Sequence, residues 1–319
     1  MDALLIMLKN VIVFVLLALP GYILVKSKQL KSAQAGALSK VLMYVGMPFL
    51  ILSSTLKLSF NPELIKTLLI VAVIGILFIM MTFFLSIPLT SGEKDKKTRG
   101  MMRFCSVFSN NGFLGLPLAI AVFGADAKAV TVVIILNIIT NILMYTLGIY
   151  LVSGDKQAMN LKKAFLSPVL IAFIVGIALN LLKVTKYVPE ITTYSNHFSG
   201  IVTPISMTIL GMKMGGVQFT KLFTNWKTYY VSLLKLIVFP VAIVGILLGV
   251  RAIFSNSFVD EGLIMGVFMA FAVPTAGLAS TFSDQFDGDT EGAVAFTLGT
   301  TILSVLTIPV IYWLLCMII

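Results

Sequence analysis

The chain has 319 residues, of which 59% are hydrophobic and only 11% are charged. Soluble domains carry roughly a quarter of charged residues, so this composition excludes a soluble protein and indicates an integral membrane protein surrounded by lipid bilayer. The formal net charge is +10, but the lysines and arginines are scattered between apolar runs, which argues against a nucleic-acid partner. Cys105, Cys316 and the single His197 offer neither a disulfide framework nor a metal site, and we expect no cofactor.

Ten apolar runs follow one another along the chain, and each is long enough for a transmembrane helix. A bilayer core of about 30 Å requires about 20 apolar residues per helix. The first run follows Lys9 in the manner of a signal peptide, but it continues past Pro20 without a small-residue cleavage pattern, so we expect a retained span. The links are short and rich in turn residues. The predicted spans are residues 4–25, 35–56, 64–89, 101–123, 129–152, 164–182, 197–217, 228–250, 261–283 and 291–318.

The links between the spans alternate in positive charge. Links one, three, five, seven and nine carry 15 lysines and arginines, whereas the even links carry 6. Because cytoplasmic loops are enriched in these residues, we predict that the odd links are cytoplasmic and that both termini lie on the outer side of the plasma (inner) membrane. Link nine departs from the pattern, since its charges are all acidic: Asp284, Asp287, Asp289 and Glu291.

The two halves of the chain repeat a pattern of residues. Pro48, with Lys57 nine positions later, recurs as Pro204 and Lys213 at an offset of 156, and residues 123–126 align with 286–289 at an offset of 163. With five spans in each half, the second half must start on the opposite side of the membrane. We therefore predict an all-α membrane protein of two inverted five-helix repeats, residues 1–153 and 154–319.

Two spans at related positions carry helix breakers and polar residues. Span four contains SNNGFLGLPLAIAVFG (109–124), and span nine contains VPTAGLAS (273–280). Backbone groups cannot stay unpaired against lipid, so matched breaks indicate a protein-lined cavity and a substrate site. The alternative is that proline and glycine only kink the helices or allow close packing. The site residues predicted from these breaks are Asn110, Asn111, Gly112, Gly115, Pro117, Pro274, Thr275 and Ser280. We place the interruption of span four within NNGFLGLP.

Polar faces follow each break. In span five, Asn137 and Asn141 lie one turn apart on one helix face, and the offset of 163 relates them to Thr300 and Ser304 in span ten. We predict that these four residues also line the substrate site. Hydrogen bonding between helices is the alternative role for such side chains.

The charges inside the membrane favour an anionic substrate. No carboxylate lies securely inside a span, although Asp284 and Glu291 at span ends stay candidates for a proton relay. Without a buried carboxylate, the cavity is lined by amides, hydroxyls and the N-terminal ends of half-helices, so it is neutral or positive. Such a lining attracts anions. Lys235 in span eight, together with Lys57 and Lys213, could add positive charge, but snorkelling to the interface is the favoured role for these lysines.

The stretches NNGFLGLPLA and VPTAGLAS, with the ten-span pattern, resemble the auxin efflux carrier family over essentially the whole chain. This family includes plant auxin exporters and bacterial permeases for malate or malonate. The resemblance implies that broken helices four and nine cross at mid-membrane. It also implies an elevator-like motion, with spans one, two, six and seven as the scaffold. It assigns Asn110, Asn111 and Pro117 to the first crossover, and Pro274 and Thr275 to the second.

The short connection at residues 153–163 replaces the long cytoplasmic loop of the plant carriers, so regulation through that loop is not carried over and the substrate need not be auxin. We predict a secondary active transporter for a small organic anion, a carboxylate such as malate or malonate. The alternatives are a sodium-coupled organic anion symporter of the bile-acid type, a channel or a membrane scaffold. An enzyme is disfavoured, because the spans hold no nucleophile, metal cluster or paired acid and base. The coupling ion, whether proton or sodium, and the oligomeric state, including a homodimer, are left open.

Overall fold

The computed structural model describes residues 2–58, 62–125, 127–159, 162, 165–216, 224–254 and 259–319. Within them the regular secondary structure is helical apart from one isolated β-bridge, which confirms the predicted all-α membrane fold. Helices coincide with the ten predicted spans, and six helical segments are long and apolar enough to cross a membrane. Asp126, Lys163 and Lys221, which contribute to the alignment of the halves and to the lysine count, lie outside the described residues.

The helices follow the same order in both halves of the chain. The elements of the first half are α1 (Asp2–Lys26), η1 (Ser32–Gln34), α2 (Ala35–Val41), η2 (Leu42–Gly46), α3 (Met47–Leu56), α4 (Pro62–Leu89), α5 (Lys96–Val107), η3 (Asn111–Gly115), α6 (Leu116–Phe123), α7 (Lys128–Leu143), η4 (Met144–Gly148) and α8 (Ile149–Ser153). After η5 (Lys156–Ala158), the second half contains α10 (Pro168–Leu181), α11 (Val184–Tyr187), α12 (Glu190–Ser199), α13 (Val202–Gly215), α15 (Trp226–Leu233), η6 (Leu234–Val238), α16 (Phe239–Ile253), α17 (Glu261–Ala272), α18 (Ala279–Gln285) and α19 (Thr290–Ile318).

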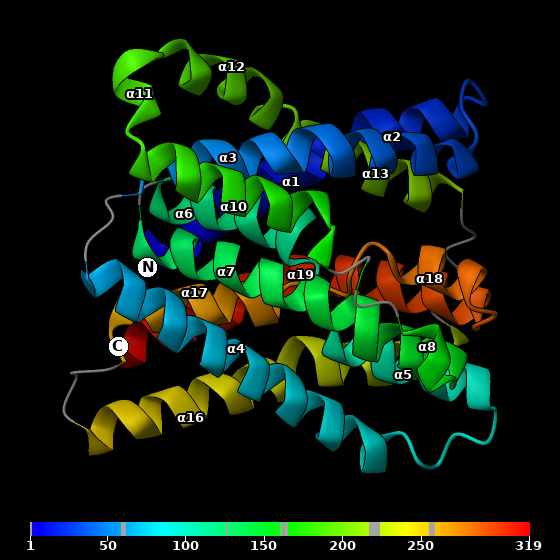
Figure 1. The fold of residues 1–319 in the computed structure, drawn as a ribbon. Helices are drawn as coiled ribbons and strands as arrows, with labels where there is room; N and C mark the ends of the chain where they lie inside the picture. Colours follow the sequence, from blue (N-terminus) through cyan, green and yellow to red (C-terminus); the bar gives the residue numbers. More distant parts are fainter. Residues whose placement is uncertain are drawn as a thin grey trace.

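The spans form two helical bundles that lie against each other (Figure 1). In the four-span bundle, made of spans one, two, six and seven, α1 packs against α13, and α3 packs against α10 and α12. In the six-span bundle, made of the remaining spans, α7 packs against α4 and α17, and α15 packs against α19. The bundles meet where α1 contacts α6 and α19, and where α13 contacts η3. This grouping matches the division into scaffold and moving spans that the family resemblance implies.

The four-span bundle is held together by close contact between the backbones of α1 and α13. A Cβ atom added to Gly211 would lie 1.8 Å from the carbonyl oxygen of Ala18, and one added to Gly21 would lie 2.0 Å from the carbonyl oxygen of Thr208. Only glycine fits at such distances. Small residues allow this approach in membranes, where van der Waals packing drives helix association.

Ion pairs at the helix ends show which links share a face of the molecule. Lys97 Nζ lies 2.7 Å from Asp287 Oδ1 and joins links three and nine, and Lys128 pairs with Asp260 between links four and eight. Odd links therefore contact odd links, and even links contact even links, as expected when each span crosses the membrane once. The acidic link nine, which departs from the lysine pattern, lies against the basic link three.

Three π-helical turns each precede a proline. The turns η2, η3 and η6 end two residues before Pro48, Pro117 and Pro240. A proline has no N–H to donate and its ring clashes with the carbonyl of the preceding turn. The wider π-turn relieves this conflict, so the helix continues through the proline instead of breaking.

Candidate functional site

Spans four and nine are both broken, and their broken segments cross in contact with each other. The helix α5 ends at Val107 and α17 ends at Ala272. Ser109 then lies opposite Thr275 in a single antiparallel bridge. Asn110 N donates to Pro274 O at 2.8 Å, and Ala276 N donates to Phe108 O at 2.9 Å. The two bonds satisfy backbone groups that lipid could not satisfy. The prediction of broken, crossing helices four and nine is confirmed.

The first break lies upstream of the position predicted from glycine and proline. The extended segment is residues 108–110, whereas Gly112 and Gly115 belong to the π-turn η3 and Pro117 to the first turn of α6. The interruption within NNGFLGLP was therefore wrongly placed. The physical reason is that Asn110 starts the next half-helix, because its side-chain oxygen accepts a hydrogen bond from Phe113 N at 3.3 Å.

The crossing also corrects the alignment of the two halves. Two segments that cross on a pseudo-two-fold axis place equivalent residues opposite each other. The offset of 163 would pair Ser109 with Ala272, but the structure pairs Ser109 with Thr275. The equivalent of Asn111 at the second break is then Gly277 rather than Pro274. Only one of the two breaks therefore carries an asparagine pair.

A cluster of buried amides and hydroxyls lies beside the first break. Asn111 Nδ2 donates to Thr140 Oγ1 at 2.9 Å, and Asn141 Nδ2 donates to Asn137 Oδ1 at 3.1 Å and to Asn137 O at 2.7 Å. Asn111 and Asn137 are each only 2% exposed. Among the described residues, Asn111 Oδ1 and Asn137 Nδ2 have no hydrogen-bond partner. Such unpaired buried atoms are uncommon and costly, so they mark a site that a ligand or water could complete.

This cluster lines a small cavity of about 50 Å³ at the contact between the two bundles. Asn110, Asn111, Gly112, Asn137 and Asn141 are among its lining residues, which places five predicted site residues together. A Cβ on Gly112 would lie 2.8 Å from Met47 Cε, so the glycine lets this side of the cavity approach the four-span bundle closely. The cavity is further lined by Met43, Met47, Ser109, Phe113, Thr140, Met144, Val169, Ala276, Gly277 and Leu278.

The predicted residues of the second break mainly satisfy the backbone. Thr275 Oγ1 donates to Cys105 O at 2.7 Å, and Thr275 N donates to Thr300 Oγ1 at 3.3 Å. Ser304 donates to Thr301 O on its own helix at 2.7 Å. Ser280 lies in the first turn of α18. Thr300, Ser304 and Ser280 therefore do not join the asparagine cluster.

Two lysines point into the crossing instead of snorkelling, so the favoured reading of these side chains was wrong. Lys235, carried by η6, is only 1% exposed, and its Nζ donates to Ser109 Oγ. Lys213 Nζ donates to Gly277 O at 3.1 Å. Lys57 is exposed, as expected. The sequence signal for Lys235 is its position inside an apolar span, seven residues from the nearer end, rather than at a span end.

The carboxylates at span ends do not belong to this site. Asp284 and Glu291 are both exposed, and Asp284 accepts a hydrogen bond from Thr290 Oγ1 at 2.8 Å at the helix ends. None of the described residues that line the cavity beside the first break is acidic.

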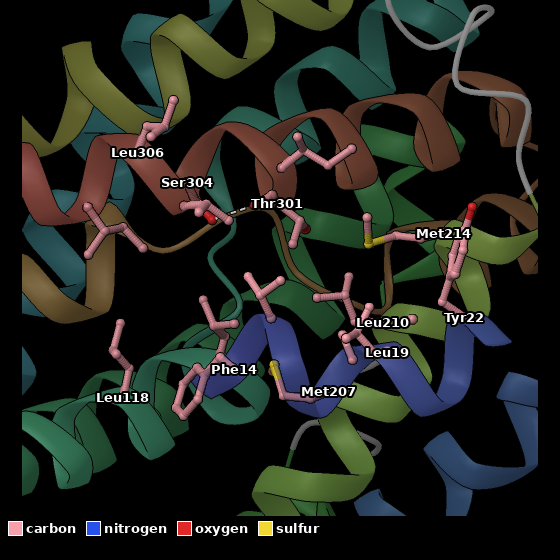
Figure 2. Close-up of a pocket in the computed structure, with 17 residues that line it drawn as sticks. Phe14, Leu19, Tyr22, Leu118, Met207, Leu210, Met214, Thr301, Ser304 and Leu306 are labelled. Atoms are coloured by element: carbon pink, nitrogen blue, oxygen red, sulfur yellow. Dashed lines mark hydrogen bonds between the residues drawn. The ribbon is translucent and has the colours of Figure 1, made fainter. Parts of the chain in front are cut away.

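A larger cavity of about 510 Å³ separates the two bundles next to the crossing. Figure 2 shows Phe14, Leu19 and Tyr22 of α1 across from Thr301, Ser304 and Leu306 of α19. Met207 and Met214 of α13 also line it, as Figure 2 shows. The lining is almost entirely apolar, which distinguishes it from the amide-lined cavity.

Comparison with known proteins identifies the family. A family model described as "Membrane transport protein" matches the chain twice, over residues 5–163 and 156–312. The chain belongs to this family. Its two matches follow the repeat that the spans and the crossing display, and the family is the auxin efflux carrier family that the sequence motifs resemble. The chain is therefore a multi-pass membrane protein of a transporter family.

Two relatives are both described as uncharacterized transporters. An uncharacterized transporter of Methanothermobacter thermautotrophicus is 27% identical over 306 residues, which cover 94% of this chain and 96% of the relative. An uncharacterized transporter of Methanocaldococcus jannaschii is 29% identical over 211 residues, which cover 64% of this chain and 68% of the relative.

Proposed function

We propose that this transporter is a secondary carrier that moves a small organic anion, a carboxylate such as malate or malonate. The observation that carries this proposal is the cavity in which Asn111 and Asn137 each present an unpaired polar atom. The cavity lies at the N-terminal end of the half-helix formed by η3 and α6, where the helix dipole favours an anion. The buried Lys235 and the partly buried Lys213 add positive charge, one beside each break.

The two unpaired atoms favour a ligand that both accepts and donates hydrogen bonds. Asn137 Nδ2 is a donor and suits a carboxylate oxygen, whereas Asn111 Oδ1 is an acceptor and needs a donor. A 2-hydroxy acid such as malate supplies both groups at neutral pH. Malonate supplies a donor only when one carboxyl is protonated. We therefore expect malate to bind more tightly than malonate near pH 7, and the difference to shrink in acid.

Transport would proceed by an elevator-like movement of the six-span bundle against the four-span bundle. A cavity of about 50 Å³ holds one or two waters, each of which occupies roughly 30 Å³, and is too small for a dicarboxylate. Binding therefore requires the asparagine cluster to move away from Met43 and Met47 of the four-span bundle. This geometry corresponds to a closed state between inward and outward access.

Uptake into proteoliposomes is the direct test of the proposed function. Labelled malate should enter with saturable kinetics and should exchange against unlabelled malate trapped inside. A channel would show neither saturation nor counterflow. A sodium gradient that drives uptake would favour the bile-acid type symporter, and uptake of cations without any organic anion would contradict the electrostatic argument.

The orientation belongs to the same proposal. We place the odd links in the cytoplasm and both termini outside the plasma membrane, on the basis of the 15 positive residues in the odd links against 6 in the even links. In Figure 1 the two termini lie near each other on the same side of the molecule, as an even number of spans requires. A membrane-impermeant thiol reagent should label a cysteine placed at residue 28 only after the cells are opened.

A further inference from the structure

Lys235 is a lysine that is only 1% exposed inside a membrane span. It lies in the π-turn η6, about one third of the way along span eight, and its Nζ donates to Ser109 Oγ at the crossing. Burying a charge at this depth is costly unless a group of opposite sign accompanies it. The ion pairs of the described residues all lie at helix ends, and none involves Lys235: they are Lys97–Asp287, Lys128–Asp260 and Lys227–Glu93.

The opposite charge comes from the carboxyl ends of the two half-helices. The last carbonyls of a helix lack intrahelical donors and carry a partial negative charge. The helix α5 ends at Val107 and α17 ends at Ala272, both just before the crossing, and η6 packs against α5 and α17. Lys235 therefore faces the negative ends of the half-helices, whereas the asparagine cluster lies at the positive end of η3.

Carbonyls at the ends of broken membrane helices are the usual ligands of coupling cations in transporters. At this crossing, the ammonium group of Lys235 occupies the position where such a cation would bind. The hydroxyl of Ser109, which accepts from Lys235, is the kind of oxygen ligand that a sodium ion would otherwise use. A bound sodium ion and the ammonium could not share this position, because like charges at such distances repel.

We propose that Lys235 is a built-in cation that replaces an exchangeable coupling cation at the crossing, so that this carrier neither binds nor requires sodium there. The inference rests on the proposed role of the crossing as the transport site, but it does not depend on the identity of the substrate. Removing the ammonium should leave the carbonyl ends uncompensated and create a vacant site for a small monovalent cation.

Thermal unfolding of the purified protein tests this without any substrate. Melting temperatures would be measured in the chlorides of sodium, ammonium, methylammonium and choline at equal ionic strength. The wild type should melt at the same temperature in all four. Lys235→Ala should melt lower in choline and recover by about 1–2 °C in a small cation present at roughly five times its Kd.

Two further variants separate cation binding from loss of packing. Lys235→Met fills the same space without a charge, so it should be destabilised and should not respond to any cation. Lys128→Ala removes a lysine from an exposed ion pair and should show no preference among the four salts. Equal responses of Lys235→Ala and Lys235→Met would overturn the proposal, because the recovery would then not reflect a vacated cation position.

The wild type alone also tests the proposal, and this measurement does not require Lys235→Ala to fold. Stabilisation of the wild type by sodium relative to choline would contradict the proposal directly. Recovery of folded Lys235→Ala only when it is prepared in ammonium or sodium would support it. Failure of malate uptake in the wild type would count against the proposed substrate, but it would leave these melting results and their interpretation unchanged.

Discussion

The asparagine cluster yields a prediction in which the effects on stability and on binding have opposite signs. In Asn137→Ala, the hydrogen bond that Asn137 Oδ1 accepts from Asn141 at 3.1 Å is lost, but the bond from Asn141 Nδ2 to the backbone oxygen at 2.7 Å stays. The lost bond contributes about 0.5–1.5 kcal/mol, whereas the unpaired Nδ2 that is also removed costs about 1–3 kcal/mol. The free energy of unfolding should therefore be unchanged or higher by about 1 kcal/mol.

Binding of malate should weaken in the same variant. A hydrogen bond to a charged group contributes about 1.5–3 kcal/mol, and about 1.4 kcal/mol corresponds to a factor of ten. Without the Asn137 amide we expect the Kd for malate to rise roughly 10- to 150-fold. The Kd would be measured from the dependence of the melting temperature on malate concentration, and counterflow would report transport.

Asn141→Ala provides the matched control, because it removes the same side chain one turn away on the same helix face. The Asn141 amide already donates to Asn137 and is not left unpaired, so we expect its loss to weaken malate binding less than tenfold. If Asn137→Ala folded normally and bound malate within threefold of the wild type, the assignment of the unpaired amide to the substrate would be refuted.

Substitutions at three further positions test the structure. Gly211→Val should prevent folding or lower stability by more than about 4 kcal/mol, measured by thermal unfolding, because its side chain would overlap the backbone of α1. Thr300→Val should cost about 1–3 kcal/mol by removing the acceptor of Thr275 N, while Thr300→Ser should retain most of the stability, and equal losses would contradict this role. The hydrogen bond from Lys227 lowers the pKa of Glu93 below 4.5, so the stability that this pair contributes is present above that value and lost as the pH falls. The melting temperatures of the wild type and Glu93→Gln should differ near neutral pH and converge as the pH falls through the lowered pKa of Glu93, and a constant difference would exclude this linkage.

The ten spans and the existence of two breaks could be predicted, because both depend on local chemistry. A run of about 20 apolar residues has no alternative to a membrane helix, and matched glycine and proline residues in two such runs are difficult to explain by packing alone. Asn110 and Asn111 were predicted from the first of these breaks, and Asn137 from the polar face of the span that follows it. The two-bundle arrangement followed from the family resemblance and not from the residues themselves.

The position of the first break and the register of the crossing could not be predicted, because both depend on distant partners. Glycine and proline suggested a break within NNGFLGLP, residues 110–117, yet Pro117 continues the helix behind a π-turn. The pairing of Ser109 with Thr275 joins segments from opposite halves and has no local signal. The prediction that Lys235 snorkels to the membrane interface was wrong for a similar reason. It was based on Lys235 and its own helix, and its partner Ser109 comes from a distant segment.

The methionines between the two bundles suggest how the proposed movement of one bundle against the other can occur. Met43, Met47 and Met144 line one cavity, and Met207 and Met214 line the other. Unbranched thioether side chains adapt to changing neighbours, so one helical layer can slide past another while staying in contact.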